Sequence, residues 1–553
     1  MVMASGQSIM AATVFSVGAW VALGVAAFSL VFIFAFLVAW FSGRKRANRD
    51  RERRRRCAGM LGREYSDDVD GLLERYYGEP ASTIEGLNAR EEADDKSRKD
   101  AFFASRRCVL ASSQPFAEKR KKKRSPPAVC LLTYGTRGDV EPMVALAIEL
   151  QKRGVQATVC ASACYKNIIK EANGVLFASC GVDEVIQTAE MHAQESFSSI
   201  IPYFAKIFPR LCAGMWKCCV EANADFIVAG PLVTSPGLMI ARKLGIPCWA
   251  AHFAPSKFKT KHMPPPEDTK SYVQWPWINK AKYDLRNASI IFQVIKSGMI
   301  GMIKSFHASI DLPQLSPSES QALDDNMPVL LAYSSVIQPR APDWPHHLFT
   351  CGYWKMPPNS DFEPSSTLMD FLRLEKRCVF VTLGSMKYPK LKQLVSMCAQ
   401  AAFQEDCKVI IGCQADTFEP RELCAPSKSH LHLTPFIPHS WIFPKCACVI
   451  HHGGAGTTSS AAFAGVPSIV VPILPWADQT FWGNRVEKLR IGALVSKSDI
   501  LDGDGIMLVR STLRACFHKS IQARAACIKR RLEAEESGAS VAASAIAEKL
   551  AAA

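Results

Sequence analysis

A glycine-rich turn between two apolar runs constrains the fold of this chain more than any other feature. Residues 449–479 read VIHHGGAGTTSSAAFAGVPSIVVPILPWADQ. The pattern predicts a strand, a tight turn, an alanine-rich helix and a second strand followed by Asp478 and Gln479. Backbone N–H groups and the helix dipole point into such a turn, so it favours an anionic group. An ordinary βα loop is the alternative, but the flanking histidines, threonines and Asp-Gln pair favour a diphosphate site without a metal.

A second unit of this kind opens at Ala128. Residues 128–162 read AVCLLTYGTRGDVEPMVALAIELQKRGVQATVCAS. We expect a buried strand, a turn, an amphipathic helix and another strand, which is the start of a doubly wound parallel domain. The turn carrying Thr136 and Asp139 would lie at the carboxyl end of the first strand, where such sheets bind ligands. On position alone, the commoner role of Asp139 is to cap the helix that Pro142 helps to start.

The 449–479 segment resembles the nucleotide-sugar signature of the UDP-glucose-dependent glycosyltransferases of family 1, which have the GT-B fold. The sterol 3β-glucosyltransferase branch is the most similar. The resemblance implies that Asp478 and Gln479 hold glucose hydroxyls. The stretch before Asp478 is longer than the family's, which leaves the donor sugar open. Contact with the diphosphate is implied for His452, Gly454, Gly456, Thr457 and Thr458.

The GTRGD turn is similar to the motif that carries the catalytic base in sterol and antibiotic-aglycone glucosyltransferases. This similarity implies that Asp139 receives the proton of the acceptor hydroxyl and that Thr136 is a second polar contact. A secondary alcohol is a poor nucleophile, so a positioned base is needed when it attacks the anomeric carbon.

The acceptor side is expected in the first half of the chain. The run FAPSKFKT, residues 253–260, resembles the family's acceptor-side loop and implies roles for Phe253 and Pro255. Between residues 167 and 222 the helical stretches are rich in apolar and aromatic side chains. Such a stripe more often forms a core than an acceptor groove. It includes Tyr203, Phe204, Phe208 and Trp216.

The two halves are expected to join after Val329–Tyr333, which we interpret as the last strand of the first domain. The following segments, PRAPDWP at 339–345 and TCGYW at 350–354, resemble a linker peculiar to the sterol branch. By the same resemblance, the last helix of the segment 520–550 returns to the first lobe.

The rest of the donor site is expected near two loops of the second half. Ser385 follows the predicted strand 378–383, and the resemblance implies a place near the phosphates. The run TPFIPH at 434–439 is similar to the loop that reads the base. It implies that Phe436 stacks on uracil, that the backbone at Ile437 reads the edge of the base, and that His439 lies beside it.

Composition narrows the class of protein. The chain has 553 residues, 48% of them hydrophobic, which is enough for two or three domains with large cores. Its net charge of +15 is concentrated in residues 44–56 and 119–124. Such runs are typical of solvated tails or membrane-surface contacts, and no nucleic-acid-binding module accompanies them. The 20 cysteines lack metal-ligand spacing and indicate buried thiols in a reducing compartment.

The N-terminus suggests a membrane anchor. No charged side chain occurs in residues 1–43, and the apolar run from Ile9 to Phe41 exceeds the length of about 20 residues that a spanning helix needs. A cleaved signal peptide fits poorly, because a basic n-region is missing. The arginine-rich segment that follows would lie on the cytosolic side, with the catalytic domains facing the cytosol.

We therefore predict an α/β protein with a transmembrane helix and two Rossmann-like lobes facing across a cleft. The expected divisions are an anchor at 1–43, a disordered basic tether at 44–127, an acceptor-binding domain at 128–348 and a UDP-sugar-binding domain at 349–553. Expected partners are UDP-glucose, a sterol and a membrane, without nucleic acid, cofactor or metal. Another lipid or terpenoid acceptor or another UDP-sugar is the alternative within the fold. A catalytically silent, membrane-tethered lipid-binding protein is the alternative from another class.

Overall fold

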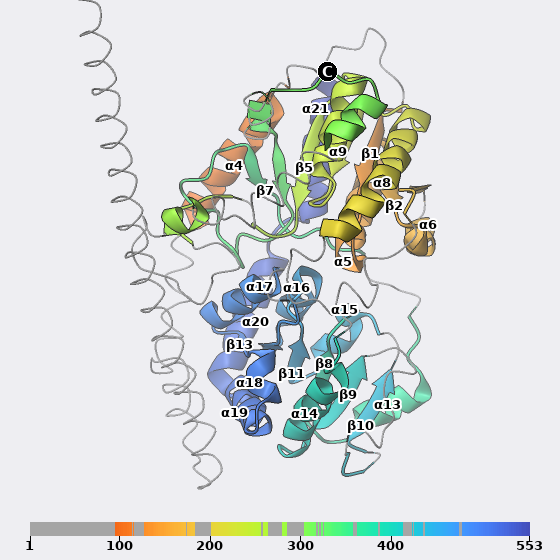
Figure 1. Ribbon diagram of the computed structural model, residues 1–553. Helices are drawn as coiled ribbons and strands as arrows, with labels where there is room; N and C mark the ends of the chain where they lie inside the picture. Colours follow the sequence, from red (N-terminus) through yellow and green to blue (C-terminus); the bar gives the residue numbers. More distant parts are fainter. Residues whose placement is uncertain are drawn as a thin grey trace, which may run out of the picture.

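The fold is taken from a computed structural model of the chain (Figure 1). It describes residues 95–112, 114, 126–172, 174–182, 201–255, 258–263, 279–284, 303–316, 319, 322–323, 326–357, 362–384, 388–412, 423, 425–427, 429–434, 437–474 and 478–552. The predicted anchor at 1–43 lies outside these residues. Within the described part, no helix has the length and apolar character needed to cross a membrane.

The first lobe is built on a seven-stranded parallel sheet with the order β3-β2-β1-β4-β5-β6-β7. The sheet's central strands are buried along their whole length, as their apolar runs predict. The strands are β1 (Ala128–Leu132), β2 (Gln156–Ala161), β3 (Leu176–Ser179), β4 (Phe226–Ala229), β5 (Cys248–His252), β6 (Val329–Leu331) and β7 (Leu348–Thr350). The helices are α4 (Asp95–Ala111), α5 (Arg137–Gln151), α6 (Lys166–Glu171), α8 (Ile201–Glu221) and α9 (Thr234–Leu244), with a 3-10 turn η1 (Ala163–Tyr165).

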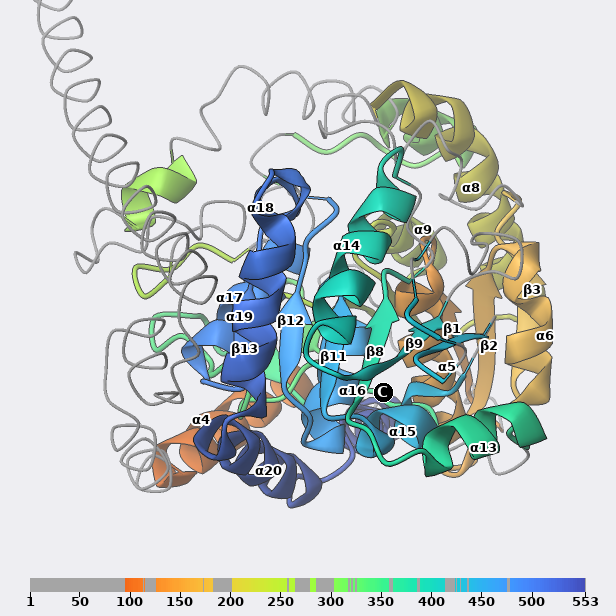
Figure 2. The ribbon, with the colours of Figure 1, turned by 90° about the horizontal axis from the view of Figure 1, so that it is seen from below.

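The second lobe has a six-stranded parallel sheet with the order β10-β9-β8-β11-β12-β13. Figure 1 shows this sheet and the helices around it below the first lobe, and Figure 2 shows the same lobe from below. The strands are β8 (Cys378–Thr382), β9 (Lys408–Gly412), β10 (Leu431–Thr434), β11 (Cys448–His451), β12 (Ser468–Val470) and β13 (Gly492–Leu494). The helices are α13 (Ser366–Arg373), α14 (Leu391–Phe403), α15 (His439–Ile442), α16 (Ala455–Ala464), α17 (Gln479–Lys488), α18 (Lys497–Leu501), α19 (Gly505–Phe517), α20 (Lys519–Glu533) and α21 (Gly538–Ala552), with a 3-10 turn η5 (Phe443–Lys445).

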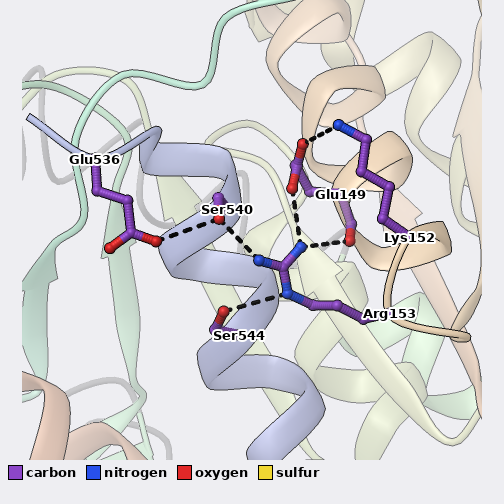
Figure 3. Close-up of polar contacts among 6 residues, drawn as sticks. All are labelled: Glu149, Lys152, Arg153, Glu536, Ser540 and Ser544. Atoms are coloured by element: carbon purple, nitrogen blue, oxygen red, sulfur yellow. Dashed lines mark hydrogen bonds and ion pairs between the residues drawn. The ribbon is translucent and has the colours of Figure 1, made fainter. Parts of the chain in front are cut away.

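The last helix belongs by packing to the first lobe, which confirms the expected return of the chain. Arg153 at the end of α5 donates to Ser540 Oγ at 2.8 Å and to Ser544 Oγ at 3.2 Å on α21 (Figure 3). The same guanidinium binds Glu149 at 2.8 Å, and Ser540 donates to Glu536 at 3.3 Å. Figure 1 accordingly shows α21 among the helices of the upper lobe.

Two of the predicted boundaries are wrong. Strand β7 pairs in parallel with β6, so Val329–Tyr333 is not the last strand of the first sheet, and that sheet extends past residue 348. In the sequence, the three residues of β7 follow a proline-rich stretch, so the pattern indicates part of the linker. Only the open edge of β6 makes them a strand.

The segment 44–127 is also not a tether throughout, because residues 95–111 form helix α4. Its Phe102 ring packs 5.2 Å from Phe349 of β7, and Lys549 of α21 donates to the carbonyl of Leu110 at 2.9 Å. Seven of its 17 residues are charged, so its apolar periodicity is weak in the sequence. Contacts with β7 and α21 supply the stability that its own composition does not.

Candidate active site

The loop after β1 folds the carboxylate of Asp139 back onto its own turn. Thr136 donates to Asp139 Oδ2 from its backbone N–H at 2.7 Å and from its hydroxyl at 3.1 Å. Gly135 has φ +148°, and a Cβ there would lie 2.2 Å from Asp139 Oδ2. Only glycine therefore allows this close approach. Asp139 therefore does cap helix α5, and these hydrogen bonds hold its carboxylate in one place at the carboxyl edge of the sheet.

The environment of Asp139 suits a base. Burial raises the pKa of its carboxyl group to about 6, while the hydrogen bonds from Thr136 oppose the rise. The negative charge of Asp478 raises the pKa further. Asp139 is on the first lobe and Asp478 on the second, so two carboxylates from opposite lobes lie near enough for their charges to interact. At pH 7 Asp139 is mostly ionised and can accept a proton.

The glycine turn of the second lobe is held by its own backbone and side chains. Gly453 donates its N–H to His451 Nδ1 at 3.0 Å, and Thr458 Oγ1 donates to the carbonyl of Gly454 at 3.0 Å. Gly454 precedes the first residue of α16, so the N–H groups of the first turn point out of the helix. At Gly456 a Cβ would meet nothing within 4 Å. The turn thus presents free backbone N–H groups toward open space, as an anion site requires.

His452 stands beside this turn with an unused nitrogen. A Cβ on Gly384 would lie 2.8 Å from its Cε1, and a Cβ on Gly454 would lie 2.6 Å from its Nε2. Its Nδ1 is buried and has no hydrogen-bond partner among the described residues. Burial lowers the pKa of His452 to about 4, so the ring is neutral at pH 7. A buried, unpaired ring nitrogen next to free amides fits a phosphate oxygen as its missing partner.

His439 lies close to His452 and faces a cation that the sequence did not single out. Its ring stacks on Phe443 with centroids 4.4 Å apart. Burial lowers the pKa of His439 to about 4, and the charges of His452 and Arg137 lower it further. Arg137 is the first residue of α5 and forms an ion pair with Glu141. Figures 1 and 2 agree that this end of α5 approaches α15 and α16. The place of Arg137 in the GTRGD motif is the signal in the sequence that could have indicated it.

The two residues of the Asp-Gln pair have different surroundings. Burial raises the pKa of Asp478 to about 6, and Trp482 Nε1 donates to its Oδ2 at 2.8 Å. Gln479 is buried and accepts the N–H groups of Ile473 and Leu474 at 2.8 and 2.9 Å. The oxygen of Gln479 therefore holds the backbone of the preceding loop. Its role toward a sugar stays a prediction.

The acceptor-side residues lie in the first lobe as expected, in a packed setting. Phe253 is buried, and its ring packs 6.3 Å from that of Trp354; Pro255 is also buried. Nearer the loop of Asp139, the hydroxyls of Tyr134 and Tyr203 are 3.0 Å apart, which brings α8 to the end of β1. Tyr203 and Phe204 belong partly to the core, so the stripe of α8 serves packing at least in part.

The remaining donor-site residues differ in how the structure bears on them. Ser385 and Phe436 lie outside the described residues, so their roles stay predictions. The side chain of Ile437 is 3% exposed and packs with Phe380 and Phe443, which leaves only its backbone for a base. Among the described residues, no group of three or more His, Cys, Asp or Glu side chains is arranged to hold a metal ion.

Two family models match the chain, one in each lobe. Residues 129–263 match the glycosyltransferase family 28 N-terminal domain. Residues 399–547 match the C-terminal domain of erythromycin biosynthesis protein CIII-like proteins. The two domain matches and the two-lobed fold resemble those of the GT-B glycosyltransferase family.

Within this family, curated relatives point to one branch. The sterol 3β-glucosyltransferase of Candida albicans is 26% identical over 408 residues, which cover 70% of this chain and 26% of that protein. The sterol 3β-glucosyltransferase UGT80A2 of Arabidopsis thaliana is 26% identical over 383 residues, or 66% of this chain and 57% of that protein. These matches confirm the resemblance to the sterol branch. The chain spans only about a quarter of the first of these relatives.

Solved structures confirm the two-lobed fold. The glycosyltransferase of kitacinnamycin matches with a TM-score of 0.56 and 17% identity, over 77% of this chain and all of that one. The glycosyltransferase VinC, in complex with DTDP, matches with a TM-score of 0.53 and 17% identity, over 76% of this chain and 99% of that one.

Proposed function

We propose that this glycosyltransferase transfers glucose from UDP-glucose to the 3β-hydroxyl of a membrane sterol, giving a steryl glucoside and UDP. The observation that carries the proposal is that two carboxylates from opposite lobes, Asp139 and Asp478, lie near enough for their charges to interact. The sterol and the glucose are named by the relatives, and the arrangement of the two lobes suits both substrates.

In this proposal the acceptor oxygen attacks the anomeric carbon while Asp139 takes its proton. The C–O bond to the diphosphate breaks on the opposite side, so the anomeric configuration inverts and UDP leaves. Asp139 is ionised at pH 7 and held by Thr136, which suits a base that must stay in place as the alcohol approaches.

Charge on the departing diphosphate is stabilised by the N-terminal turn of α16, by His452 and by the hydroxyl of Thr457. His439 and His452 are neutral at pH 7, so preorganised dipoles supply most of the stabilisation of the diphosphate. Arg137 brings a positive charge from the opposite lobe. Asp478 holds glucose hydroxyls on the far side of the sugar from the diphosphate.

We further propose that the reaction needs no divalent cation, because the N-terminal turn of α16 and the buried Nδ1 of His452, unpaired among the described residues, can hold a diphosphate without a metal. Dialysis against EDTA should leave turnover unchanged. Loss of activity that Mg²⁺ or Mn²⁺ restores would contradict this part of the proposal.

We also propose that residues 1–43 anchor the chain in a membrane with the catalytic lobes on the cytosolic side. The support is the uncharged, apolar N-terminal run followed by the arginine-rich segment 44–56. An anchor would keep the active site where a sterol partitions.

The direct test incubates the full-length protein in membranes with UDP-glucose or UDP-galactose and a panel of sterols, glycolipids and terpenoid alcohols. We expect a steryl glucoside with inverted anomeric configuration. Product from a non-sterol acceptor alone would contradict the acceptor, and product from UDP-galactose alone would contradict the donor.

Replacing the base separates catalysis from binding. Asp139→Asn keeps an oxygen that can accept the Thr136 N–H but cannot take a proton, so we expect kcat to fall about 10²- to 10⁴-fold. UDP affinity, measured by calorimetry, should stay within about twofold of the wild type. Full activity of the variant would remove Asp139 as the base. An inactive wild type would instead favour the lipid-binding alternative.

A further inference from the structure

Helix α17 connects the sugar-binding carboxylate with the opposite lobe. Its residue Trp482 is fully buried, and its Nε1 donates to Asp478 Oδ2 at 2.8 Å. The same ring meets Tyr333, directly after β6 of the first lobe, edge to face with centroids 5.9 Å apart. One turn further on, Arg485 donates to the carbonyl of Ile337 through Nε and Nη2 at 2.9 and 2.6 Å.

This arrangement places one tryptophan between two sites that must be aligned for transfer. The first lobe carries the base, and Asp478 is the proposed contact of the sugar. Because Trp482 touches both Asp478 and a residue of the first lobe, its position fixes the sugar contact relative to that lobe. The hydroxyl of Tyr333 has no hydrogen-bond partner among the described residues, so its ring alone makes this contact.

We propose that Trp482 is a positioning residue. Its indole N–H holds the carboxylate of Asp478 ionised and oriented for the sugar of the donor. Its ring contacts Tyr333 and so fixes the position of that carboxylate relative to the first lobe. The inference rests on the proposed use of UDP-glucose. One oxygen of Asp478 is engaged by the indole, and Oδ1 then accepts a sugar hydroxyl. No contact with the nucleotide or the diphosphate is assigned to Trp482.

The physical basis is the competition between burial and hydrogen bonding at Asp478. Burial raises the pKa of its carboxyl group to about 6, and the indole N–H opposes the rise because it binds the ionised form. The charged group that faces it from the other lobe is Asp139, which favours protonation of one of the pair. Removing the N–H should therefore raise the pKa of Asp478 further and leave its carboxylate free to rotate.

The test replaces only the N–H. Trp482→benzothienylalanine has sulfur in place of the indole N–H and almost the same shape. We expect the affinity for UDP-glucose at pH 6.5 to fall about tenfold or more, because a hydrogen bond to a charged group is lost. The affinity for UDP should change less than about twofold, since UDP has no sugar for Asp478 to bind. The deficit for UDP-glucose should shrink at pH 8.5, where the carboxyl group ionises without help.

Calorimetry with UDP and UDP-glucose, on the full-length protein in detergent at both pH values, gives all of these quantities. Trp482→Phe is a second variant that also lacks the N–H, and Trp344→benzothienylalanine is the matched control. The indole N–H of Trp344 has no hydrogen-bond partner among the described residues, so this variant should bind UDP-glucose like the wild type.

Unchanged binding of UDP-glucose by the variants at Trp482 would overturn the proposal. Equal losses for UDP and UDP-glucose would also overturn it, and so would a deficit that stays constant or grows with pH. A wild-type protein that binds neither ligand would instead refute the proposed function, so the two failures are distinguishable.

Discussion

At the scale of single residues, the facing carboxylates Asp139 and Asp478 govern how the reaction responds to pH. Burial raises the pKa of each to about 6, and the two are near enough for one charge to affect the other. Both groups must be ionised for the proposed reaction. We expect kcat/KM to fall as pH decreases through about 6, with a slope that approaches two protons, measured from pH 4.5 to 8.5.

The same two groups should make the fold more stable as pH falls, which is the opposite of their effect on activity. This difference separates titration from unfolding. Their folded pKa values lie above the ordinary value of 3.8 for an aspartate, so the folded state binds more protons between pH 4 and 6. Their burial as anions costs stability above pH 6, and the cost disappears as pH falls. Circular dichroism should show a folded protein at pH 5.5, where activity is already reduced. Unfolding that coincides with the loss of activity would contradict this account.

Two glycines of the same turn provide a second test at this scale. At Gly456 an added Cβ meets only open space, so Gly456→Ala should keep or raise stability, by up to about 1 kcal/mol for a helical position. The same methyl group would occupy the space given to the diphosphate, so UDP affinity should fall. At Gly453, φ is +89° and a Cβ would lie 2.6 Å from Val470 Cγ1, so Gly453→Ala should destabilise the fold. Thermal unfolding and UDP titration of both variants check the contrast, and unchanged UDP affinity in Gly456→Ala would contradict it.

At the scale of elements, the two connections between the lobes pass each other at a pair of glycines. Gly352 follows β7 and Gly538 begins α21, and a Cβ on Gly538 would lie 2.2 Å from the carbonyl group of Gly352. Contacts on either side join the lobes further. Lys355 lies over the ring of Phe463 at 3.5 Å, and Ser335 donates to Glu535 at 3.3 Å. The relative position of the lobes therefore depends on close backbone packing at this crossing.

Gly538→Ala tests the importance of the crossing. We expect a loss of about 1–3 kcal/mol in the free energy of unfolding, because the new methyl group must displace backbone rather than a flexible side chain. Gly503→Ala is the matched control, since a Cβ there meets nothing within 4 Å. Denaturant unfolding of both variants measures the difference. Equal stability of the two variants would show that the crossing is not tightly packed in solution.

At the scale of the whole molecule, the described residues from α4 to α21 make the contacts that build the two lobes. The chain from 128 to 552 supplies both sheets, and α4 and α21 together close one side of the first lobe. The catalytic lobes should therefore fold without the N-terminal run.

Deletion of residues 1–43 tests the proposed anchor. We expect the shortened protein to move from the membrane fraction to the supernatant while keeping its kcat toward a sterol presented in detergent micelles. The full-length protein is the control. Retention of the shortened protein in membranes after a high-salt wash would contradict the anchor, and loss of activity in detergent would show that the segment also serves the catalytic lobes.

Much of this architecture follows from local patterns. Buried β-branched runs, glycine turns and amphipathic helices recur at the right spacing to predict both sheets, the cleft and the sites at the ends of β1 and β11. These features depend on neighbours in the chain, so their signal survives in a single sequence. The loop motifs also located Asp139 and Asp478, because a turn at the end of a parallel strand is where such folds bind ligands.

Other features depend on partners distant in sequence, and only the tertiary structure decided them. The strand β7 exists because β6 offers an open edge, and α4 is a helix because Phe349 and α21 cover it. The oxygen of Gln479 is used by the loop before it, and Trp482 reaches Tyr333 across the lobes. The sequence by itself indicated the parallel sheets and the loops that carry Asp139, His452 and Asp478, since strands and turns of this kind are encoded by periodicity and turn chemistry. It could not determine which of these residues meet, because packing between segments hundreds of residues apart leaves no local pattern.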